Sequence, residues 1–279
     1  GLIGFWSTEK SRCRPERLPG SPPARSCGCE LMRFLKLKPK IFKKFSIRRG
    51  GRTFFVAGKF NFRERRTLLK KLGIKNNQLV LLEQTHHDRI LFVTSKTKIN
   101  FLGRASRRGD GLVTNLPGIF LAIHYADCLP ILFYNEAAGI IGAVHAGWKG
   151  TAEKIIQKVV GQIQKKFNAP LRDFYFFLGP AAQACCYEIY PLSISPFTRG
   201  RKGGVERTTF FPKEVIKERH GKIYLDFVKA NYLQLRELGI KQSQIENSGI
   251  CTIHNRKFPS HRREGNKRQN TLLSAIMST

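Results

Sequence analysis

The stretch that decides the fold is HYADCLPILFYNEAAGIIGAVHAGWKGT, residues 124–151. Two apolar runs in it flank a short turn-forming segment, which predicts an antiparallel hairpin. Residues that face each other across a hairpin share a constant index sum, so a pairing of Asn135 with Ala138 also pairs Cys128 with His145. We therefore expect a cysteine and a histidine close together at the open end of this hairpin.

A thiol and an imidazole at the mouth of a sheet admit three interpretations. They form a metal pair, a thiolate–imidazolium nucleophile, or simply a buried Cys128 beside a hydrogen-bonded His145. His86 favours the metal, because its polar segment EQTHHDR interrupts two strand-like apolar runs. One cysteine and two histidines with an open position make a catalytic zinc set. His87 and His124 are alternative ligands.

The flanking segments alternate between strand and helix patterns, which is typical of an α/β domain. Helices are predicted from ERRTLLKKLGI, TAEKIIQKVVGQIQKKF and LDFVKANYLQLRELGI, and a strand from FYFFLGP. The first helix has Leu68, Leu69 and Leu72 on one face and ends at Gly73, and the third ends at Gly239. The second helix has apolar residues at helical spacing, namely Ile155, Ile156, Val159, Val160, Ile163 and Phe167.

The composition indicates a folded and strongly basic protein. The 279 residues are 41% hydrophobic, and 50 Lys and Arg against 19 Asp and Glu give a net charge of +31. This charge favours either the binding of nucleic acid or another polyanion, or simply a lysine-rich surface. No apolar run is long enough to span a membrane, which predicts no membrane partner. Seven scattered cysteines predict a reducing cytoplasm.

The first 31 residues differ in character from the rest of the chain. Residues 1–31 are rich in Pro, Gly, Ser, Arg and Cys without periodicity, so we expect a disordered or non-domain extension and no signal peptide. Residues 32–279 contain no internal repeat and are predicted to form a single α/β domain.

Two further segments are typical of anion binding. AGWKGT, with Gly147 and Gly150, leads straight into a predicted helix whose first N–H groups suit a phosphate, and a simple tight turn explains the same glycines. Near the C-terminus, SHRREGNKRQN contains Arg262 and Arg263. Paired guanidinium groups bind phosphate or carboxylate in a two-pronged manner, and a solvated charged surface is the alternative.

The segments GDGLVTNLPGIFLAIHYADCLPILFYNEAAGIIGAVHAGWKGT, LLEQTHHDR, GPAAQACCYEI and FPSHRREG together resemble the YfiH/YlmD family, also known as the laccase-domain or polyphenol oxidase family. The similarity runs from about Phe45 to near the C-terminus, and ADCLP with HAGWKGT at this separation is highly specific. The resemblance implies an α/β (α+β) domain, a single layered sandwich of the YfiH type, related to the catalytic domain of cytotoxic necrotizing factor.

The resemblance also implies an activity. Members of the family are regarded as zinc-dependent purine nucleoside phosphorylases that act on adenosine, inosine and methylthioadenosine, and some deaminate adenosine. The partners it implies are therefore a purine nucleoside and phosphate, with zinc rather than copper as the cofactor. The two histidines and one cysteine that hold the metal in the family fall on His86, Cys128 and His145, which agrees with the set inferred from the residues.

The chain departs from the family pattern at several positions. His87 stands where the family usually has glycine, and Lys149 stands where it has arginine. The N-terminal family motif is present in a shortened form as SIRRGGRTFFVAGKFNF, in which Arg48 and Asn61 are the matching substrate-binding positions. HRREGNKRQN stands where a Tyr-Arg-Arg and a Gly-Arg pair are expected.

Phosphorolysis of a purine nucleoside breaks the bond between ribose and base through a cation-like sugar, so it needs a positioned phosphate and a neutralised leaving base. We expect the turn after His145, with Gly147 and Lys149, to bind phosphate together with Arg262 and Arg263. Zinc is expected to act as a Lewis acid or as an orienting centre.

Other functions make different demands on the residues. A multicopper oxidase needs many histidines, largely in His-x-His pairs, and this chain has seven histidines and no such pair, so we reject that mechanism. A hydrolase or deamidase built on Cys128 and His145 without a metal is the enzymatic alternative. A basic protein that binds RNA or another polyanion is the non-enzymatic alternative.

Overall fold

The computed structural model describes residues 33–35, 37, 39–40, 51–58, 62–73, 75–98, 104–189, 210–265 and 270–277. These residues all belong to one compact unit that runs from Leu31 to Thr279. The predicted extension 1–31 and the predicted substrate-binding residues Arg48 and Asn61 lie outside the described residues. The limits of the domain therefore stay a prediction.

The described strands form two six-stranded sheets and a small three-stranded sheet. The first sheet has the order β1 (Arg33–Phe34), β2 (Arg52–Gly58), β15 (Thr271–Met277), β7 (Phe120–Tyr125), β3 (Leu79–Glu83) and β5 (Arg104–Arg108). The second has the order β14 (Ile245–Asn247), β10 (Phe174–Leu178), β8 (Leu129–Asn135), β9 (Ile140–Ala146), β6 (Gly111–Thr114) and β4 (Ile90–Phe92). The small sheet contains β11 (Glu188–Ile189), β13 (Lys222–Leu225) and β12 (Ile216–Arg219).

The helices lie between these strands in the chain. The α-helices are α2 (Phe62–Leu72), α3 (Trp148–Ala152), α4 (Ile155–Phe167), α5 (Phe227–Glu237) and α6 (His261–Glu264). Single 3-10 turns are η1 (Asn76–Gln78), η2 (Leu171–Asp173), η5 (Lys213–Val215) and η6 (Gln242–Gln244). None of the helices in the described ranges combines the length and the apolar character that a membrane crossing requires.

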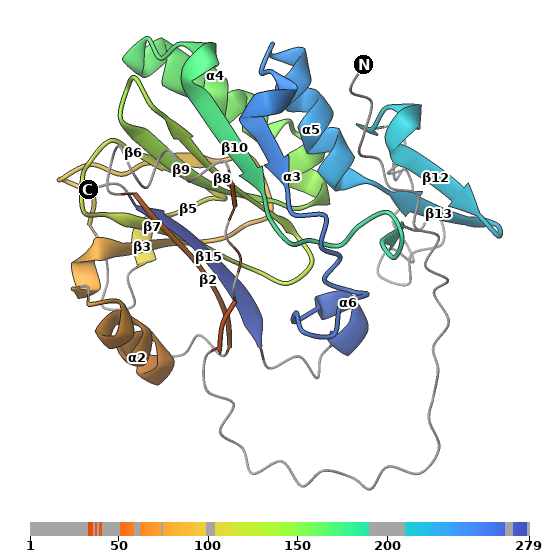
Figure 1. Ribbon diagram of the computed structural model, residues 1–279, viewed down its shortest axis with the longest axis horizontal. Coiled ribbons are helices and arrows are strands. Elements are labelled where there is room, and N and C mark those ends of the chain that lie inside the picture. The colour runs from red at the N-terminus through yellow and green to blue at the C-terminus, as the bar shows by residue number, and fades with distance from the viewer. Residues whose placement is uncertain are drawn as a thin grey trace, which may run out of the picture. The chain divides into compact units, whose positions relative to one another are not determined.

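The two large sheets pack face to face, and helices cover their outer faces (Figure 1). Between the sheets, an apolar cluster contains Phe55, Val80, Leu121, Ile123 and Ile276 from the first sheet and Leu112, Leu132, Tyr134, Ile141 and Phe177 from the second. Alternate residues of the first sheet face α2, where the cluster contains Phe54, Val56, Leu79, Phe120, Leu68 and Leu69. The predicted α/β layered sandwich is thus confirmed, and its relation to cytotoxic necrotizing factor stays a prediction.

The outer face of the second sheet carries the largest core cluster. Its sheet residues include Ile131, Phe133, Val144, Phe174 and Phe176, and its helical residues include Ile155, Ile156, Val159, Val160 and Ile163 of α4 and Phe227, Val228 and Leu235 of α5. Each such side chain contributes about 1.5–3 kcal/mol to folding when it is fully buried. Strands buried on both faces read as continuous apolar runs, which explains why LPILFY and IIGAVHA show no alternation.

Two of the three predicted helices are confirmed in kind and position, as α2 and α5. Gly73 and Gly239 follow α2 and α5 and have φ angles of +66° and +89°, the left-handed conformation that commonly ends a helix. The predicted helix over 151–167 is instead divided, because α3 ends at Ala152 and Lys154 adopts φ 58° before α4 begins. The short α3 is held against α5 by hydrogen bonds from Asn231 and Gln234 to Thr151, both 2.8 Å long.

The hairpin of β8 and β9 forms as predicted, with a different register. Asn135 pairs with Ile140 rather than with Ala138, so the index sum is 275 and not 273. The reason is a four-residue loop in which Asn135 Oδ1 accepts a hydrogen bond from the Ala138 N–H at 2.9 Å. A shift by two residues leaves every side chain on its original face, so Cys128 and His145 still meet at the open end.

Candidate active site

His86, Cys128 and His145 converge in the structure as the sequence predicts. Their ligand atoms, one sulfur and two imidazole nitrogens, all lie within 4.8 Å of one another. Cys128 directly precedes β8, and His145 lies near the end of β9. His86 comes from the loop between β3 and β4, and its ring lies edge-on to that of His145 with a centroid distance of 4.7 Å.

A buried carboxylate, Asp110, fixes the loop that carries His86. Its Oδ2 accepts hydrogen bonds from the N–H and hydroxyl of Thr85, at 3.0 and 2.8 Å, and from the His87 N–H at 3.1 Å. Its Oδ1 accepts from the His86 N–H at 2.9 Å. His86 has a φ of 63°, a conformation that costs energy for a residue other than glycine. The network around Asp110 holds it there.

Asp110 also orients His145. The two residues are neighbours because Asp110 directly precedes β6, which pairs with β9 through Gly111 and Val144. His145 Nδ1 donates to Asp110 Oδ1 at 2.8 Å, and this leaves Nε2 as the ligand nitrogen. Burial alone would raise the pKa of Asp110, but the hydrogen bond and charge of His145, with the bonds from Thr85 and His87, lower it to about 2.

Cys128 and His145 stabilise each other's charged forms. Burial alone would raise the pKa of the Cys128 thiol, but the charge and hydrogen bond of His145, helped by His86, lower it to about 6. Burial alone would lower the pKa of His145, but the charge of Cys128 and the hydrogen bond to Asp110 raise it to about 9. Around neutral pH the sulfur is therefore a thiolate, the form that binds metals and attacks electrophiles.

The two alternative ligands, His87 and His124, are not part of this cluster. His87 turns its Nδ1 to Glu153 Oε1, 2.9 Å away, and half of its side chain is exposed. His124 lies in β7, and its backbone N–H and C=O bond to the Gln84 side chain at 2.8 and 2.7 Å. The chain bends between His124 and Cys128, where Asp127 has a φ of 85°, so these two residues do not share one regular strand.

Two glycines let the turn after His145 approach the His86 loop. A Cβ atom at Gly147 would lie 3.1 Å from Cys128 Sγ and 3.6 Å from His86 Cδ2. At Gly150 it would lie 2.9 Å from the carbonyl oxygen of His87. An added Cβ atom would collide with the backbone at Gly150 and would crowd the sulfur of Cys128 at Gly147, so glycine is required for this close approach.

The three-residue cluster opens into a pocket of about 740 Å³. This volume falls in the range of small-molecule sites, roughly 300–1,000 Å³. The lining includes the aromatic residues Tyr125, Trp148, Tyr187 and Phe227, the polar residues Glu83, Gln84, Asp127 and Thr271, the cation Arg262, and the histidines His86, His124, His145 and His261.

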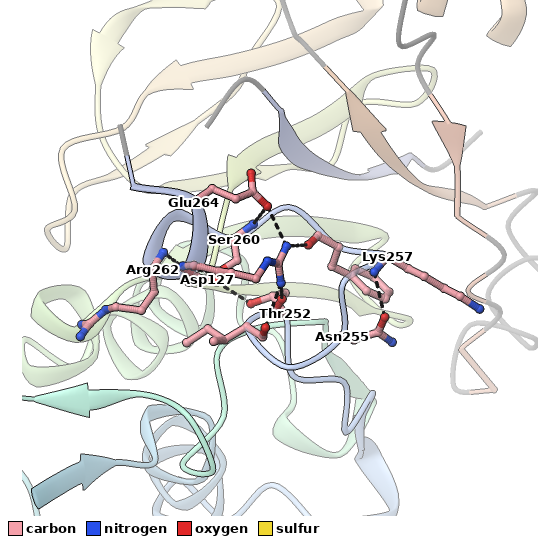
Figure 2. Close-up of polar contacts among 10 residues, drawn as sticks. Asp127, Thr252, Asn255, Lys257, Ser260, Arg262 and Glu264 are labelled. Atoms are coloured by element: carbon pink, nitrogen blue, oxygen red, sulfur yellow. Dashed lines mark hydrogen bonds and ion pairs between the residues drawn. The ribbon is translucent and has the colours of Figure 1, made fainter. Parts of the chain in front are cut away.

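A second buried carboxylate, Asp127, organises the wall that carries α6 (Figure 2). Its Oδ1 accepts from the Thr252 hydroxyl at 2.7 Å, and its Oδ2 accepts from the Ser260 hydroxyl at 3.0 Å and the Arg262 N–H at 2.7 Å. Because Asp127 immediately precedes Cys128, this network fixes the position of Arg262 relative to the cluster.

The two predicted arginines have different surroundings. Arg262 lines the pocket, where its guanidinium lies 4.9 Å from the ring centre of Tyr187 and Nη1 donates to the Glu188 carbonyl at 2.8 Å. Arg263 instead points into its own loop. Its guanidinium donates to the carbonyls of Thr252, Ile253 and Phe258 and to the Glu264 carboxylate, at 2.5–2.9 Å. Of these two arginines, Arg262 is the one that lines the pocket.

Lys149, which was also predicted to bind phosphate, is exposed in α3. Its Nζ lies 5.8 Å from the ring centre of Trp148, and it is not among the pocket-lining residues. Gly147, by contrast, is buried directly beside the sulfur of Cys128.

The residues present fit a zinc ion. Catalytic zinc sites take three protein ligands from nitrogen, sulfur and oxygen donors and keep one position open, and His86, Cys128 and His145 are such a set. A carboxylate behind a ligating histidine, here Asp110 behind His145, is the usual outer partner in such sites.

Asp110 and Asp127 were not predicted from the sequence. Both carry a signal in the sequence, because each is a single acidic residue at the edge of an apolar strand, in GDGLVT and ADCLP. An aspartate is rarely buried unless it is paired, so an acidic residue at a buried strand end indicates a specific structural or functional role. The partners could not be predicted, since they come from segments distant in the chain.

Known proteins match most of the described residues. Residues 61–278 match the family described as multi-copper polyphenol oxidoreductase laccase. A purine nucleoside phosphorylase from Bacteroides thetaiotaomicron is 30% identical over 223 residues, which are 77% of this chain and 78% of that protein. The purine nucleoside phosphorylase YlmD from Geobacillus stearothermophilus is 34% identical over 207 residues, 72% of each chain.

The fold matches a solved structure of the same kind. The crystal structure of the hypothetical protein YfiH from Bacillus licheniformis superposes with a TM-score of 0.70 at 27% identity, and the match covers 82% of this chain and 93% of that one. The resemblance to YfiH and YlmD proteins drawn from the sequence motifs is thus confirmed.

Proposed function

This chain belongs to the family described as multi-copper polyphenol oxidoreductase laccase, and we propose that it is a zinc-dependent purine nucleoside phosphorylase. Its proposed substrates are adenosine, inosine and methylthioadenosine, which it cleaves with phosphate to the free base and the sugar 1-phosphate. The names of its relatives at 30% and 34% identity support this activity. The structural observation that carries the proposal is the convergence of His86, Cys128 and His145 in a pocket that Arg262 also lines.

The metal in this proposal is held by His86, Cys128 and His145. When bound, zinc supplies Lewis acidity and a fixed positive charge beside the reacting groups. Copper remains the alternative that the family description names. We favour zinc because a trinuclear copper cluster needs many more histidines than the seven in this sequence.

Phosphate binding is assigned to Arg262, and a contribution from Gly147 and Lys149 stays a prediction. A guanidinium group has five N–H donors, and Arg262 uses Nη1 on the Glu188 carbonyl. The cation–π contact with Tyr187 and the hydrogen bond from the Arg262 backbone N–H to Asp127 fix this residue at the pocket that it lines, and its other donors are assigned to phosphate. A positioned phosphate lowers the barrier, because the reaction then occurs between partners that are already aligned.

The purine base is assigned to the aromatic part of the pocket. Trp148, Tyr187 and Phe227 all line it, and Tyr187 lies edge-on to Phe227 with a centroid distance of 5.0 Å. Aromatic side chains bind bases of any identity by stacking, at about 1–3 kcal/mol per base. This arrangement suits several purine nucleosides equally well.

Asp110 holds the proton of His145 at Nδ1 throughout, in this proposal. It thereby keeps Nε2 and the Cys128 thiolate available to the metal and prevents rotation of the ring. Deamination of adenosine is proposed as a side activity of the same residues, because it needs the same open coordination position on the metal beside the purine.

A second candidate is a hydrolase or deamidase that uses Cys128 as a nucleophile without a metal. The observation in its favour is the series Cys128, His145 and Asp110, in which a thiolate is paired with an imidazolium that a carboxylate orients. The polyanion binding and the cytoplasmic location predicted from composition stay predictions.

The test is product analysis with adenosine in the presence and absence of phosphate. Phosphorolysis predicts adenine and ribose 1-phosphate that appear only with phosphate, whereas deamination yields inosine in either condition. If chelation leaves hydrolytic activity intact and alkylation of Cys128 abolishes it, the thiol hydrolase is correct and the phosphorylase is not.

A further inference from the structure

A second group of metal-binding side chains lies apart from the pocket. The sulfur atoms of Cys185, Cys186 and Cys251 all lie within 4.8 Å of one another. Cys185 Sγ donates a hydrogen bond to Cys186 Sγ at 3.4 Å, and the two cysteines form no disulfide. None of the three cysteines lines the pocket, so the proposed phosphorylase does not use them.

The fold holds the two segments that carry these cysteines. Cys251 forms a parallel bridge with Ala181, and the Thr252 N–H donates to the Ala181 carbonyl at 3.0 Å. On the other segment, the Cys186 N–H donates to the Gln183 carbonyl at 3.0 Å and closes a turn. The sulfur atoms therefore converge on a backbone that is already ordered.

A positive charge lies close to this group, because Arg219 Nη2 donates to the carbonyls of Ala184 and Cys185 at 2.7 and 3.1 Å. A nearby cation offsets part of the negative charge that several thiolates would bring together.

A disulfide accounts for the group less well than a metal does. Adjacent residues have Cα atoms about 3.8 Å apart, shorter than the usual span of roughly 4.4–6.8 Å for a disulfide, so a bond between Cys185 and Cys186 would be strained. A bond from either to Cys251 would use two sulfurs and leave the third unexplained. Three converging sulfurs are the donor set of a thiophilic cation.

We propose that Cys185, Cys186 and Cys251 bind a soft, thiophilic cation such as Zn²⁺ or Cu⁺. The cation joins the segment that leads to Tyr187 to the turn that contains Thr252. Both are connected to the pocket, because Asp127 accepts from the Thr252 hydroxyl and, through its carbonyl, from the Ala182 N–H at 2.8 Å. Bound metal thus stabilises the wall of the active site from outside it.

The test uses cadmium as a probe under reducing conditions, in a full-length chain with Cys13, Cys27 and Cys29 replaced by serine to remove other thiols. Titration is followed by the ultraviolet charge-transfer band of the cadmium–thiolate bond. We expect this triple serine variant to bind two cadmium ions per chain. The added substitution Cys128→Ala should remove one of them, and Cys251→Ser should remove the other. Cys251→Ser should lose more of the band than Cys128→Ala, since its site has three sulfurs rather than one.

The proposal is wrong if Cys251→Ser still binds two equivalents, or if the triple serine variant binds a single equivalent that Cys128→Ala removes. A cadmium ion that still binds at Cys128 in Cys251→Ser shows that this variant is folded. If that variant does not fold, Cys185→Ser at an exposed position makes the same comparison. The readout is metal binding alone, so its outcome is independent of the phosphorylase activity.

Discussion

His145 Nδ1 donates a hydrogen bond to Asp110 Oδ1 across 2.8 Å, and both side chains are almost completely buried. The same carboxylate accepts three backbone N–H groups from Thr85, His86 and His87. One side chain thus positions two of the three proposed ligands, so Asp110 is the residue on which the geometry of the cluster depends.

Replacement of Asp110 by asparagine should weaken metal binding without preventing it. The amide keeps the size of the carboxylate but removes its charge, and loss of such an outer partner typically costs about 10–100-fold in metal affinity. Zinc affinity measured by competition with a chromophoric chelator checks this. Asp88→Asn is the matched control, because it breaks only the surface ion pair with Lys158 and should leave the affinity unchanged. Equal affinities in wild type and Asp110→Asn would contradict the assignment.

Gly147→Ala should disturb the cluster, since the added Cβ would lie 3.1 Å from Cys128 Sγ. We expect lower metal content and at least a tenfold loss in kcat/KM, about 1.4 kcal/mol. Gly161→Ala is the control. It lies in α4 with no atom within 4 Å of the new Cβ, so it should keep full activity and gain up to about 1 kcal/mol of stability. An active Gly147→Ala enzyme would show that the close approach is not needed.

Arg262→Ala should raise the KM for phosphate by roughly tenfold or more while the metal content stays constant, because charge-assisted hydrogen bonds to the anion are lost. Arg262→Lys should recover only part of this affinity, since lysine lacks the planar fork. Steady-state kinetics at varied phosphate measures both, with the exposed Arg256→Ala as the control for a change in net charge. If KM for phosphate is unaffected in Arg262→Ala, the phosphate lies elsewhere in the pocket.

Arg263→Ala should act on stability instead. Its guanidinium satisfies three backbone carbonyls and Glu264, so its removal should lower the free energy of unfolding by roughly 2–3 kcal/mol. Denaturant unfolding compares it with Arg262→Ala, whose guanidinium makes a single backbone bond and whose loss should cost less. The reverse order of the two stabilities would contradict the separate roles of these neighbouring arginines.

Local patterns in the sequence predict the elements of this fold well. The apolar spacing in α4 and the glycines after α2 and α5 depend on interactions within one segment, so the sequence carries them directly. The hairpin register was wrong by two residues, because the loop length depends on the hydrogen bond that Asn135 makes. The break between α3 and α4 was also missed, since α3 is held by Asn231 and Gln234 of a distant helix.

The candidate site divides in the same way. Cys128 and His145 could be placed together because one hairpin carries both. The roles of Asp110 and Asp127 depend on pairings between distant strands and loops, as does the convergence of Cys251 with Cys185. Arg262 and Arg263 are adjacent and chemically identical, so only the fold distinguishes the one that lines the pocket from the one that binds its own loop.

The most direct measurement of the central claim is the metal content and adenosine turnover of purified wild type and Cys128→Ala, each with and without phosphate. The account predicts that Cys128→Ala contains one zinc fewer per chain than wild type, determined by mass spectrometry, and that it no longer releases adenine. Wild-type release of adenine should depend strictly on phosphate. Equal zinc in the two proteins, or adenine release by Cys128→Ala at the wild-type rate, would contradict the assignment of this cluster as the catalytic metal centre.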